Sequence, residues 1–244
     1  MVQVLASLHQ KTIPEISPQR KAQVEGELTL IVPYPSATPS FIAAVEDGLW
    51  EPELGWLVEQ LFSKLAKFNA EANIRTESVP RDILKAPHLV DVGAGIGYFT
   101  LRALKANPTA GATVIAPQPI NSYFLRMNIA ACPQELGARV NILQDLMTSR
   151  AQQSIGVGRY LHTPAFNFLD AYLLPQKTSP LDIAKWNESY DSVSYHETGT
   201  IDDLILPKKN VWLLKIDVSG TEVRCSSTRG AFTSKVSRRY YSYI

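Results

Sequence analysis

The sequence has few cysteines, little net charge and no long hydrophobic run. Its 244 residues include two cysteines, Cys132 and Cys225, too few for a disulfide framework or a cysteine-rich metal site. The formal net charge of +1 argues against a surface dedicated to nucleic acid. No apolar run reaches the length of a signal peptide or the roughly 18 residues of a membrane span. We therefore expect a protein of a reducing compartment, the cytoplasm or an organelle, with no membrane span.

The four histidines do not have the spacing of metal ligands. They stand at positions 9, 88, 162 and 196, and His196-Glu197 lacks the second histidine of a metalloprotease helix. We therefore expect no metal site and assign each histidine a surface or core role.

Positive charge gathers at the end of the chain. After Glu222 the sequence has no acidic residue and five basic ones, Arg224, Arg229, Lys235, Arg238 and Arg239. This tail also contains tyrosines, but it offers no stacking platform on a defined fold. A nucleic-acid partner is therefore not expected.

Apolar periodicity predicts one domain after an N-terminal extension. Residues 1–50 are expected to be partly irregular, above all at 11–26 with two prolines, apart from one strand at 28–32. From Pro52, leucines at 54, 57, 61 and 65 and then Phe68 recur at helical spacing, so we expect a helix with this face buried. We place the domain at 51–222 and treat 223–244 as a separate basic tail.

Strand and helix signals then alternate along the domain. They predict strands at 89–92, 113–116, 139–143 and 211–217, and helices at 98–106 and from Pro119. Right-handed crossovers make the first three strands parallel neighbours with helices on the faces. Residues 146–210 are too many for a plain loop, so we expect a strand or hairpin plus a short helix there, with cover over a ligand crevice as one option.

The stretch LVDVGAGIGYFT, from Leu89 to Thr100, predicts a nucleotide or nucleoside cradle. An apolar strand leads into three glycines at 93, 95 and 97, and a helix follows. Glycine is needed because a Cβ would hold the backbone away from a ligand and restrict the dihedral angles of the turn. The first amides of the helix then face the ligand. A dinucleotide-binding turn has its third glycine where this chain has Tyr98, and the alternative is an α/β turn of another kind.

Three motifs in order resemble those of FkbM-type methyltransferases, which are class I S-adenosylmethionine-dependent enzymes. That family reads DVGANIGYFT where this chain has DVGAGIGYFT, and its second helix resembles QPINSYFLRMNI at 118–129. Its lysine-isoleucine-aspartate-valine-glutamate-glycine run resembles LLKIDVSGTE at 213–222, which follows TIDDLI at 200–205. A fainter match is DGLWEPE at 47–53. The resemblance implies an α/β fold with a Rossmann-like class I methyltransferase sheet, mostly parallel, and S-adenosyl-L-methionine as cofactor.

The resemblance also implies the residues of the site. Those of the cofactor site are Asp91, Gly93, Gly95, Gly97, Tyr98, Phe99, Gln118, Asn121 and Asp145. Asp91 is expected near the cationic sulfonium and ammonium groups of the cofactor. Asp145 is expected near the adenine, or else is a helix cap or a solvated loop acid. Asp217, at the end of the last strand, is the candidate catalytic residue, as a base or to orient an acceptor, unless it only holds loop amides.

Two departures from the family pattern bear on activity. The glutamate that binds the ribose hydroxyls in that family is missing from the run IAPQP, which leaves Gln118 as the only nearby polar substitute. The later motif glutamate is Ser219 here, and residues 223–244 are too few for the three further strands of a complete sheet. We therefore expect the sheet to be incomplete after its fourth strand, with an exposed edge at 211–217 that invites aggregation or a protein partner unless the tail covers it.

Two functions stay open from the sequence. The first is S-adenosylmethionine-dependent methyl transfer to an oxygen of a small-molecule or glycan acceptor, as the resemblance implies. The alternative is a catalytically impaired, truncated remnant that acts at most as a cofactor-binding or interaction module. The glycine motif favours the first, and the two departures favour the second.

Overall fold

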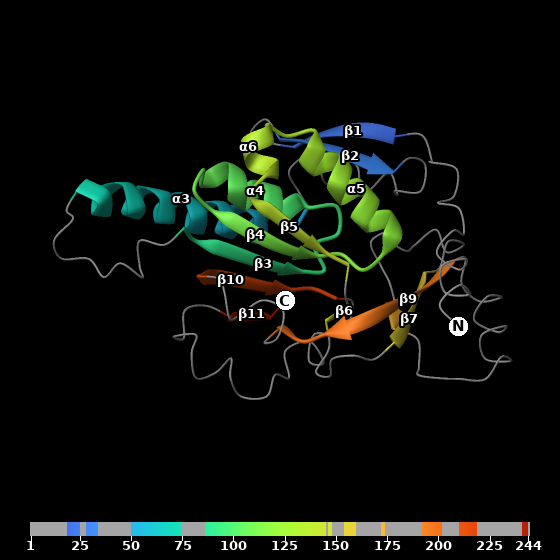
Figure 1. Ribbon diagram of the computed structural model, residues 1–244. Helices are drawn as coiled ribbons and strands as arrows, with labels where there is room; N and C mark the ends of the chain where they lie inside the picture. The colour runs from blue at the N-terminus through green and yellow to red at the C-terminus, as the bar shows by residue number, and fades with distance from the viewer. Residues whose placement is uncertain are drawn as a thin grey trace, which may run out of the picture.

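The computed structural model describes a central α/β unit and several segments around it (Figure 1). The described residues are 19–24, 28–33, 50–74, 86–144, 146–147, 154–159, 172–173, 192–201, 210–218 and 241–243. Asp145, one of the predicted site residues, lies outside them.

A five-stranded parallel sheet forms the centre of the described unit. Its strands are β3 (His88–Val92), β4 (Gly111–Ile115), β5 (Val140–Leu143), β10 (Val211–Ile216) and β11 (Tyr241–Tyr243), in the order β11-β10-β3-β4-β5. Every neighbouring pair is parallel. The chain runs from β3 out to β5 and then returns to the other side of β3, which is the strand order of a doubly wound Rossmann-like sheet. The predicted α/β fold class and the three parallel neighbours are confirmed.

Strand β11 corrects the prediction that the sheet ends at its fourth strand, and it bears out the alternative in which the tail covers the open edge. Tyr241, Ser242 and Tyr243 pair with β10 from Leu214 to Ile216, so the edge is covered there. The tail was expected to lack strands because its sequence shows no clear alternation of strand and helix signals. Aromatic residues nevertheless favour strands, and an edge with unpaired backbone groups is a template for three of them. A protein partner at this edge stays a prediction.

The two faces of the sheet carry separate hydrophobic clusters, because successive side chains of a strand point to opposite faces. Leu89 and Leu213 belong to the cluster on the face of helix α4 (Tyr98–Ala106), which contributes Leu101 and Leu104. Val90 and Leu214 belong to the opposite cluster, which Ile201 joins. Asp91 and Lys215 follow Leu89 and Leu213 by two residues, so their side chains lie on the face of α4.

Helix α3 (Pro52–Ile74) confirms the helix predicted from Pro52 and part of its predicted buried face, since Leu65 is buried and Leu54 and Leu61 pack partly buried against the core. Val58 and Phe62 are buried, whereas Leu57 is 48% and Phe68 is 44% exposed. Apolar residues stand on both sides of the predicted face, and packing against α4 selects which of them are buried. Of the helices in the described part of the chain, none is both long and apolar enough to cross a membrane.

The remaining helices of the unit lie between β4 and β5. Helix α5 (Pro119–Ala130) has its proline at the first position, as predicted, where the missing amide proton costs no helical hydrogen bond. The short helix α6 (Gln134–Gly137) follows it.

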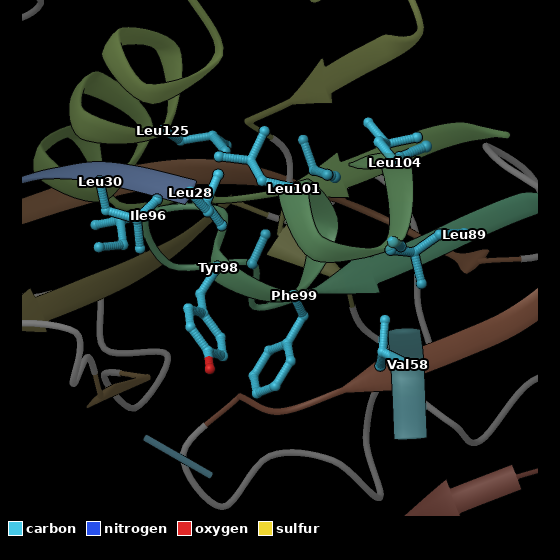
Figure 2. Packing of buried hydrophobic residues seen from close by; sticks show 14 of the residues in the cluster. Leu28, Leu30, Val58, Leu89, Ile96, Tyr98, Phe99, Leu101, Leu104 and Leu125 are labelled. Atoms are coloured by element: carbon cyan, nitrogen blue, oxygen red, sulfur yellow. The ribbon is translucent and has the colours of Figure 1, made fainter. Parts of the chain in front are cut away.

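An N-terminal hairpin packs on the unit. Strand β1 (Gln19–Val24) pairs antiparallel with β2 (Leu28–Pro33), so the prediction that 11–26 is irregular is wrong for residues 19–24. The strand predicted at 28–32 is confirmed, and Leu28 and Leu30 are buried next to Ile96 and Leu125 (Figure 2). Part of the segment expected as an extension therefore belongs to the core.

A second sheet interrupts the path from β5 to β10. Its strands are β6 (Leu146–Met147), β7 (Ser154–Arg159), β8 (Tyr172–Leu173) and β9 (Ser192–Gly199), in the order β6-β9-β7-β8. The predicted hairpin in 146–210 is confirmed by the antiparallel pairs of β7. Figure 1 shows β7 and β9 past the carboxyl ends of the main strands. Ile201 is helical and 202–209 lie outside the described part, so the short helix stays a prediction, as does cover over a ligand crevice.

Candidate functional site

The candidate site lies where the strand order of the main sheet reverses. Strands β3 and β10 are neighbours, yet the chain leaves β3 towards β4 and reaches β10 only after β5 and the second sheet. In open α/β sheets, ligands bind outside the carboxyl ends of the strands at such a point. The carboxyl end of β3 carries the glycine turn, and the carboxyl end of β10 carries Asp217.

The glycine turn has backbone conformations that disfavour other residues. The φ angle is +79° at Gly93, +55° at Gly95 and +95° at Gly97, all in the left-handed region. Gly93 also lies against β10, because a Cβ there would be 1.8 Å from the carbonyl oxygen of Asp217. The turn therefore needs glycine for its conformation, and at Gly93 also for the close approach of two strand ends.

Helix α4 begins directly after this turn, with Gly97 as its N-cap. The amides of its first turn have no partner within the helix, and the helix dipole is positive there. A carboxylate or another polar ligand group at this end would be stabilised.

Asp91 is fully buried at the end of β3, with both carboxylate oxygens engaged. One accepts a hydrogen bond from the hydroxyl of Thr100 at 2.8 Å, and the other lies 3.2 Å from Nζ of Lys215. The negative charge of Asp91 is thus balanced inside the protein, and the carboxylate holds α4 and β10 to the end of β3. Its predicted contact with the cationic groups of a cofactor stays a prediction.

Lys215 is the central cation of the site, and the sequence reasoning did not select it. Its Nζ lies 3.5 Å from the carboxylate of Asp217, 3.4 Å from the carbonyl oxygen of Gly93 and 5.1 Å from the ring centre of Phe99. Burial lowers the pKa of Lys215, but the carboxylates of Asp91 and Asp217 outweigh burial, so the pKa is raised and the ammonium stays charged at neutral pH. A lysine inside an otherwise apolar strand was the signal available in the sequence, because a buried charge needs a partner.

Glu51 lies close enough to this cluster to interact electrostatically with it. It precedes α3 with a left-handed φ of +43°. Burial raises the pKa of Glu51, Asp217 and more weakly Asp91 raise it further, and Lys215 opposes them. Asp217 is 49% exposed. Three carboxylates around one lysine leave an excess of negative charge, and the faint match at 47–53 was the only sequence signal for Glu51.

Gln118 and Asn121 form a buried pair at the start of α5, just after β4. Nδ2 of Asn121 donates to Oε1 of Gln118 at 2.8 Å. Gln118 is 5% exposed, and its Nε2 makes no hydrogen bond to any residue in the described ranges. A buried donor without an acceptor costs about 1–3 kcal/mol. Gln118 therefore offers a donor that a ligand at the end of β4 would satisfy.

Tyr98 and Phe99 lie in the hydrophobic core, at 4% and 6% exposure. The hydroxyl of Tyr98 accepts a hydrogen bond from Nη1 of Arg102 at 2.7 Å, and Nη2 of Arg102 pairs with Glu59 of α3 at 2.8 Å. The two aromatic rings pack edge to face with centres 4.9 Å apart. In the structure these residues anchor α4 to its neighbours, and their predicted contact with a cofactor stays a prediction.

Comparisons with known proteins give partial structural likenesses. No family model matches the chain, and no curated protein matches it. Solved structures that it resembles include the glycopeptide N-methyltransferase MtfA in complex with S-adenosyl-L-methionine, at 22% identity and a TM-score of 0.24, covering 36% of this chain and 34% of that one. With sinefungin bound, MtfA matches at 20% identity and a TM-score of 0.24, over 39% and 33% of the two chains. An uncharacterized COG1565 superfamily protein from Burkholderia thailandensis matches at 14% identity and a TM-score of 0.28, over 58% and 41%.

The structure thus brings some of the predicted site residues together in two separate groups. Asp91, Gly93 and Asp217 meet at Lys215, and Gln118 pairs with Asn121 at the neighbouring strand end. Within the described ranges, no three histidine, cysteine or acidic side chains are grouped as metal ligands. The arrangement is a glycine turn and a helix N-terminus flanked by carboxylates on one side and an amide donor on the other.

Proposed function

We propose that the chain is an S-adenosyl-L-methionine-dependent methyltransferase that acts on an oxygen of a small-molecule or glycan acceptor. The observation that carries the proposal is the turn with three left-handed glycines at the switch point of a parallel sheet, directly against Asp217. Motif spacing alone is compatible with other α/β turns, but this position is where such folds bind ligands. The acceptor class follows from the resemblance to FkbM-type enzymes.

The residues at the site fit this cofactor. The glycines leave room for the backbone to approach a ligand, and the first turn of α4 suits the cofactor's carboxylate. The exposed carboxylate of Asp217 and the nearby Glu51 suit its ammonium and sulfonium groups. Nε2 of Gln118 can donate to a ribose hydroxyl oxygen or an adenine nitrogen.

The chain's own contribution to methyl transfer is alignment and, for a hydroxyl acceptor, removal of a proton. When bound, S-adenosylmethionine would supply a methyl group for transfer to the acceptor oxygen, with S-adenosylhomocysteine as the leaving group. The half-exposed Asp217 takes the acceptor's proton or orients the hydroxyl. Lys215 and Gly93 hold the end of β10 against the glycine turn, so the carboxylate and the turn keep a constant separation.

The cofactor assignment predicts binding of S-adenosylhomocysteine that depends on Gln118 and Gly95. We expect Gln118→Leu to weaken binding about tenfold, because one hydrogen bond is lost. Gly95→Trp is expected to abolish binding by filling the turn. Isothermal titration calorimetry measures both, and Gln134→Leu on the exposed surface of α6 is the matched control with unchanged affinity. A wild-type protein that does not bind S-adenosylhomocysteine would contradict the assignment.

A second candidate function is a cofactor-binding module without catalysis. Two observations favour it. Both carboxylate oxygens of Asp91 already have partners within the protein, and the chain has Gln118 near the position where FkbM-type enzymes have a ribose-binding glutamate. Cofactor affinity would then be low, because an amide accepts a hydrogen bond less strongly than a carboxylate.

Methyl transfer separates the two candidates. We expect label from S-adenosylmethionine to enter acceptors in a cell lysate, and Asp217→Asn to reduce the rate about a hundredfold or more at saturating cofactor. The readout is scintillation counting of methylated products, with Asp217→Glu as the conservative comparison. Binding without any incorporation by the wild-type protein would support the non-catalytic module.

A further inference from the structure

We propose that Asn128 is a positioning residue of the cofactor site, because its side-chain amide holds the glycine turn in shape by tying it to strand β2. The inference rests on the proposed function for its ligand. Asn128 lies in the last turn of α5, inside the segment 118–129 that resembles the second helix of FkbM-type enzymes, but the resemblance assigns it no role.

Asn128 connects three parts of the fold. It is fully buried, and its Nδ2 donates to the carbonyl of Ile96 in the glycine turn at 2.9 Å and to the carbonyl of Ile31 in β2 at 3.2 Å. Its Oδ1 accepts the backbone N–H of Ile31. One side chain therefore pairs with both the N–H and the carbonyl of Ile31, as a neighbouring strand would. The same amide group also donates a hydrogen bond to the glycine turn.

The bond to Ile96 determines the orientation of one peptide group in the turn. The peptide between Ile96 and Gly97 has its carbonyl bound to Asn128, and its N–H donates to the carbonyl of Ala94 at 2.8 Å. Both edges of this peptide plane are thus held. Without the bond to Asn128, many backbone conformations would be accessible to Gly97. Because glycine loses more conformational entropy on ordering than any other residue, fixing this turn is costly in free energy.

Strand β2 gives this anchor a rigid support. Leu28 and Leu30 pack in the core beside Ile96 and Leu125, so strand β2 and the glycine turn belong to one hydrophobic cluster (Figure 2). Holding a binding loop in its ligand-bound shape lowers the free-energy cost of binding. The N-terminal hairpin, which shares no motif with the site, therefore contributes to cofactor affinity through Asn128.

Asn107 offers a matched control within the same chain. It is also fully buried, and its side chain makes three hydrogen bonds: Nδ2 donates to the carbonyl of Phe62 at 3.1 Å, and Oδ1 accepts from the amide and hydroxyl of Thr109 at 2.9 and 2.8 Å. It caps the C-terminal end of α4, whereas the glycine turn adjoins the N-terminal end.

The experiment compares Asn128→Ala and Asn107→Ala by thermal unfolding and by titration with S-adenosylhomocysteine. We expect both variants to lower Tm by roughly 5–10 °C, since each loses three side-chain hydrogen bonds, one of them buried and two partly buried. Only Asn128→Ala is expected to weaken S-adenosylhomocysteine binding, by about tenfold or more. Wild-type affinity in Asn128→Ala, or an equal loss in Asn107→Ala, would overturn the proposal. If Asn128→Ala does not fold, Asn128→Ser, which keeps a donor, carries the same comparison.

Hydrogen exchange separates failure of this inference from failure of the proposed function. If the wild-type protein does not bind S-adenosylhomocysteine, the proposed function fails. The hold of Asn128 on the glycine turn is then tested by the hydrogen-exchange rate of the turn itself. The amide of Gly97 should then exchange at least tenfold faster in Asn128→Ala and at the wild-type rate in Asn107→Ala. Equal exchange at Gly97 in the two variants would show that Asn128 does not hold the turn.

Discussion

Replacing Gly93 by alanine is expected to lower the free energy of unfolding by about 3–5 kcal/mol, a large part of the total stability of a typical domain. The new Cβ would lie 1.8 Å from the carbonyl oxygen and 2.8 Å from the carbonyl carbon of Asp217. Both are backbone atoms, so the clash is relieved only if the ends of β3 and β10 move apart. That movement breaks the bond from the amide of Asp217 to the carbonyl of Val92 at 3.0 Å. The left-handed φ of +79° adds about 1–2 kcal/mol of strain.

Urea denaturation of a glycine series measures this effect. Alanine at Gly97 meets the end of the Leu125 side chain at 2.7 Å, which can move, so we expect a smaller loss than at Gly93. Alanine at Gly137, at the end of α6, meets Ile129 at 3.4 Å and should change stability by less than about 1 kcal/mol. A Gly93→Ala protein as stable as Gly137→Ala would show that the strand ends are not in contact.

Replacing Lys215 by methionine is expected to destabilise the protein by about 3–5 kcal/mol, because the buried carboxylate of Asp91 loses its cation. Methionine keeps the unbranched apolar stem of the side chain, so little packing is lost, and only the ammonium with its contact to the ring of Phe99 is removed. Adding Asp91→Asn removes the unpaired charge and should recover at least about 2 kcal/mol in a double-mutant cycle. Additive effects of the two substitutions would contradict a direct ion pair. Lys64→Met on the exposed surface of α3 is the control, with an expected change within about 0.5 kcal/mol.

The pH dependence of this destabilisation has a definite sign. The pKa of Lys215 is raised in the folded protein, since Asp91 and Asp217 outweigh the lowering effect of burial. A raised pKa gives stability that is fully present below the unfolded value of about 10.4 and is lost as pH rises through the folded value. Urea midpoints should therefore show a constant difference between wild type and Lys215→Met from about pH 6 to pH 9, which narrows only above about pH 10. A difference that disappears near neutral pH would exclude Lys215 as its source.

Periodicity and glycine chemistry predicted much of the sheet. The strands at 89–92, 113–116 and 139–143 and the helix from Pro52 follow from local patterns of apolar residues, and each forms where it was expected within a few residues. Local patterns failed for β1 and β11. These strands have no clear alternation of their own and exist because β2 and β10 offer edges to pair with.

The sequence placed the candidate site at the ends of the strands, but it did not predict how the side chains of the site contact one another. Asp91 was predicted to contact the cofactor and Asp217 to act on the acceptor, each as a single residue. In the structure both carboxylates contact Lys215. The partner is 124 residues away from Asp91 along the chain. No local spacing connects them, and only the register of β3 against β10 places Lys215 opposite Asp91.

By itself, the sequence determined the order β3, α4, β4, α5, β5 and β10 of the main unit, the turn of three glycines and its place at the end of a buried strand. These features depend on backbone dihedral preferences and on the period of apolar residues, which act over a few neighbouring positions. Only the tertiary structure decided that Lys215 neutralises Asp91, that Asn128 joins the turn to β2 and that the tail covers the edge of β10. Each of these depends on a buried polar group finding its partner across a long stretch of chain, because in the interior water cannot take the partner's place.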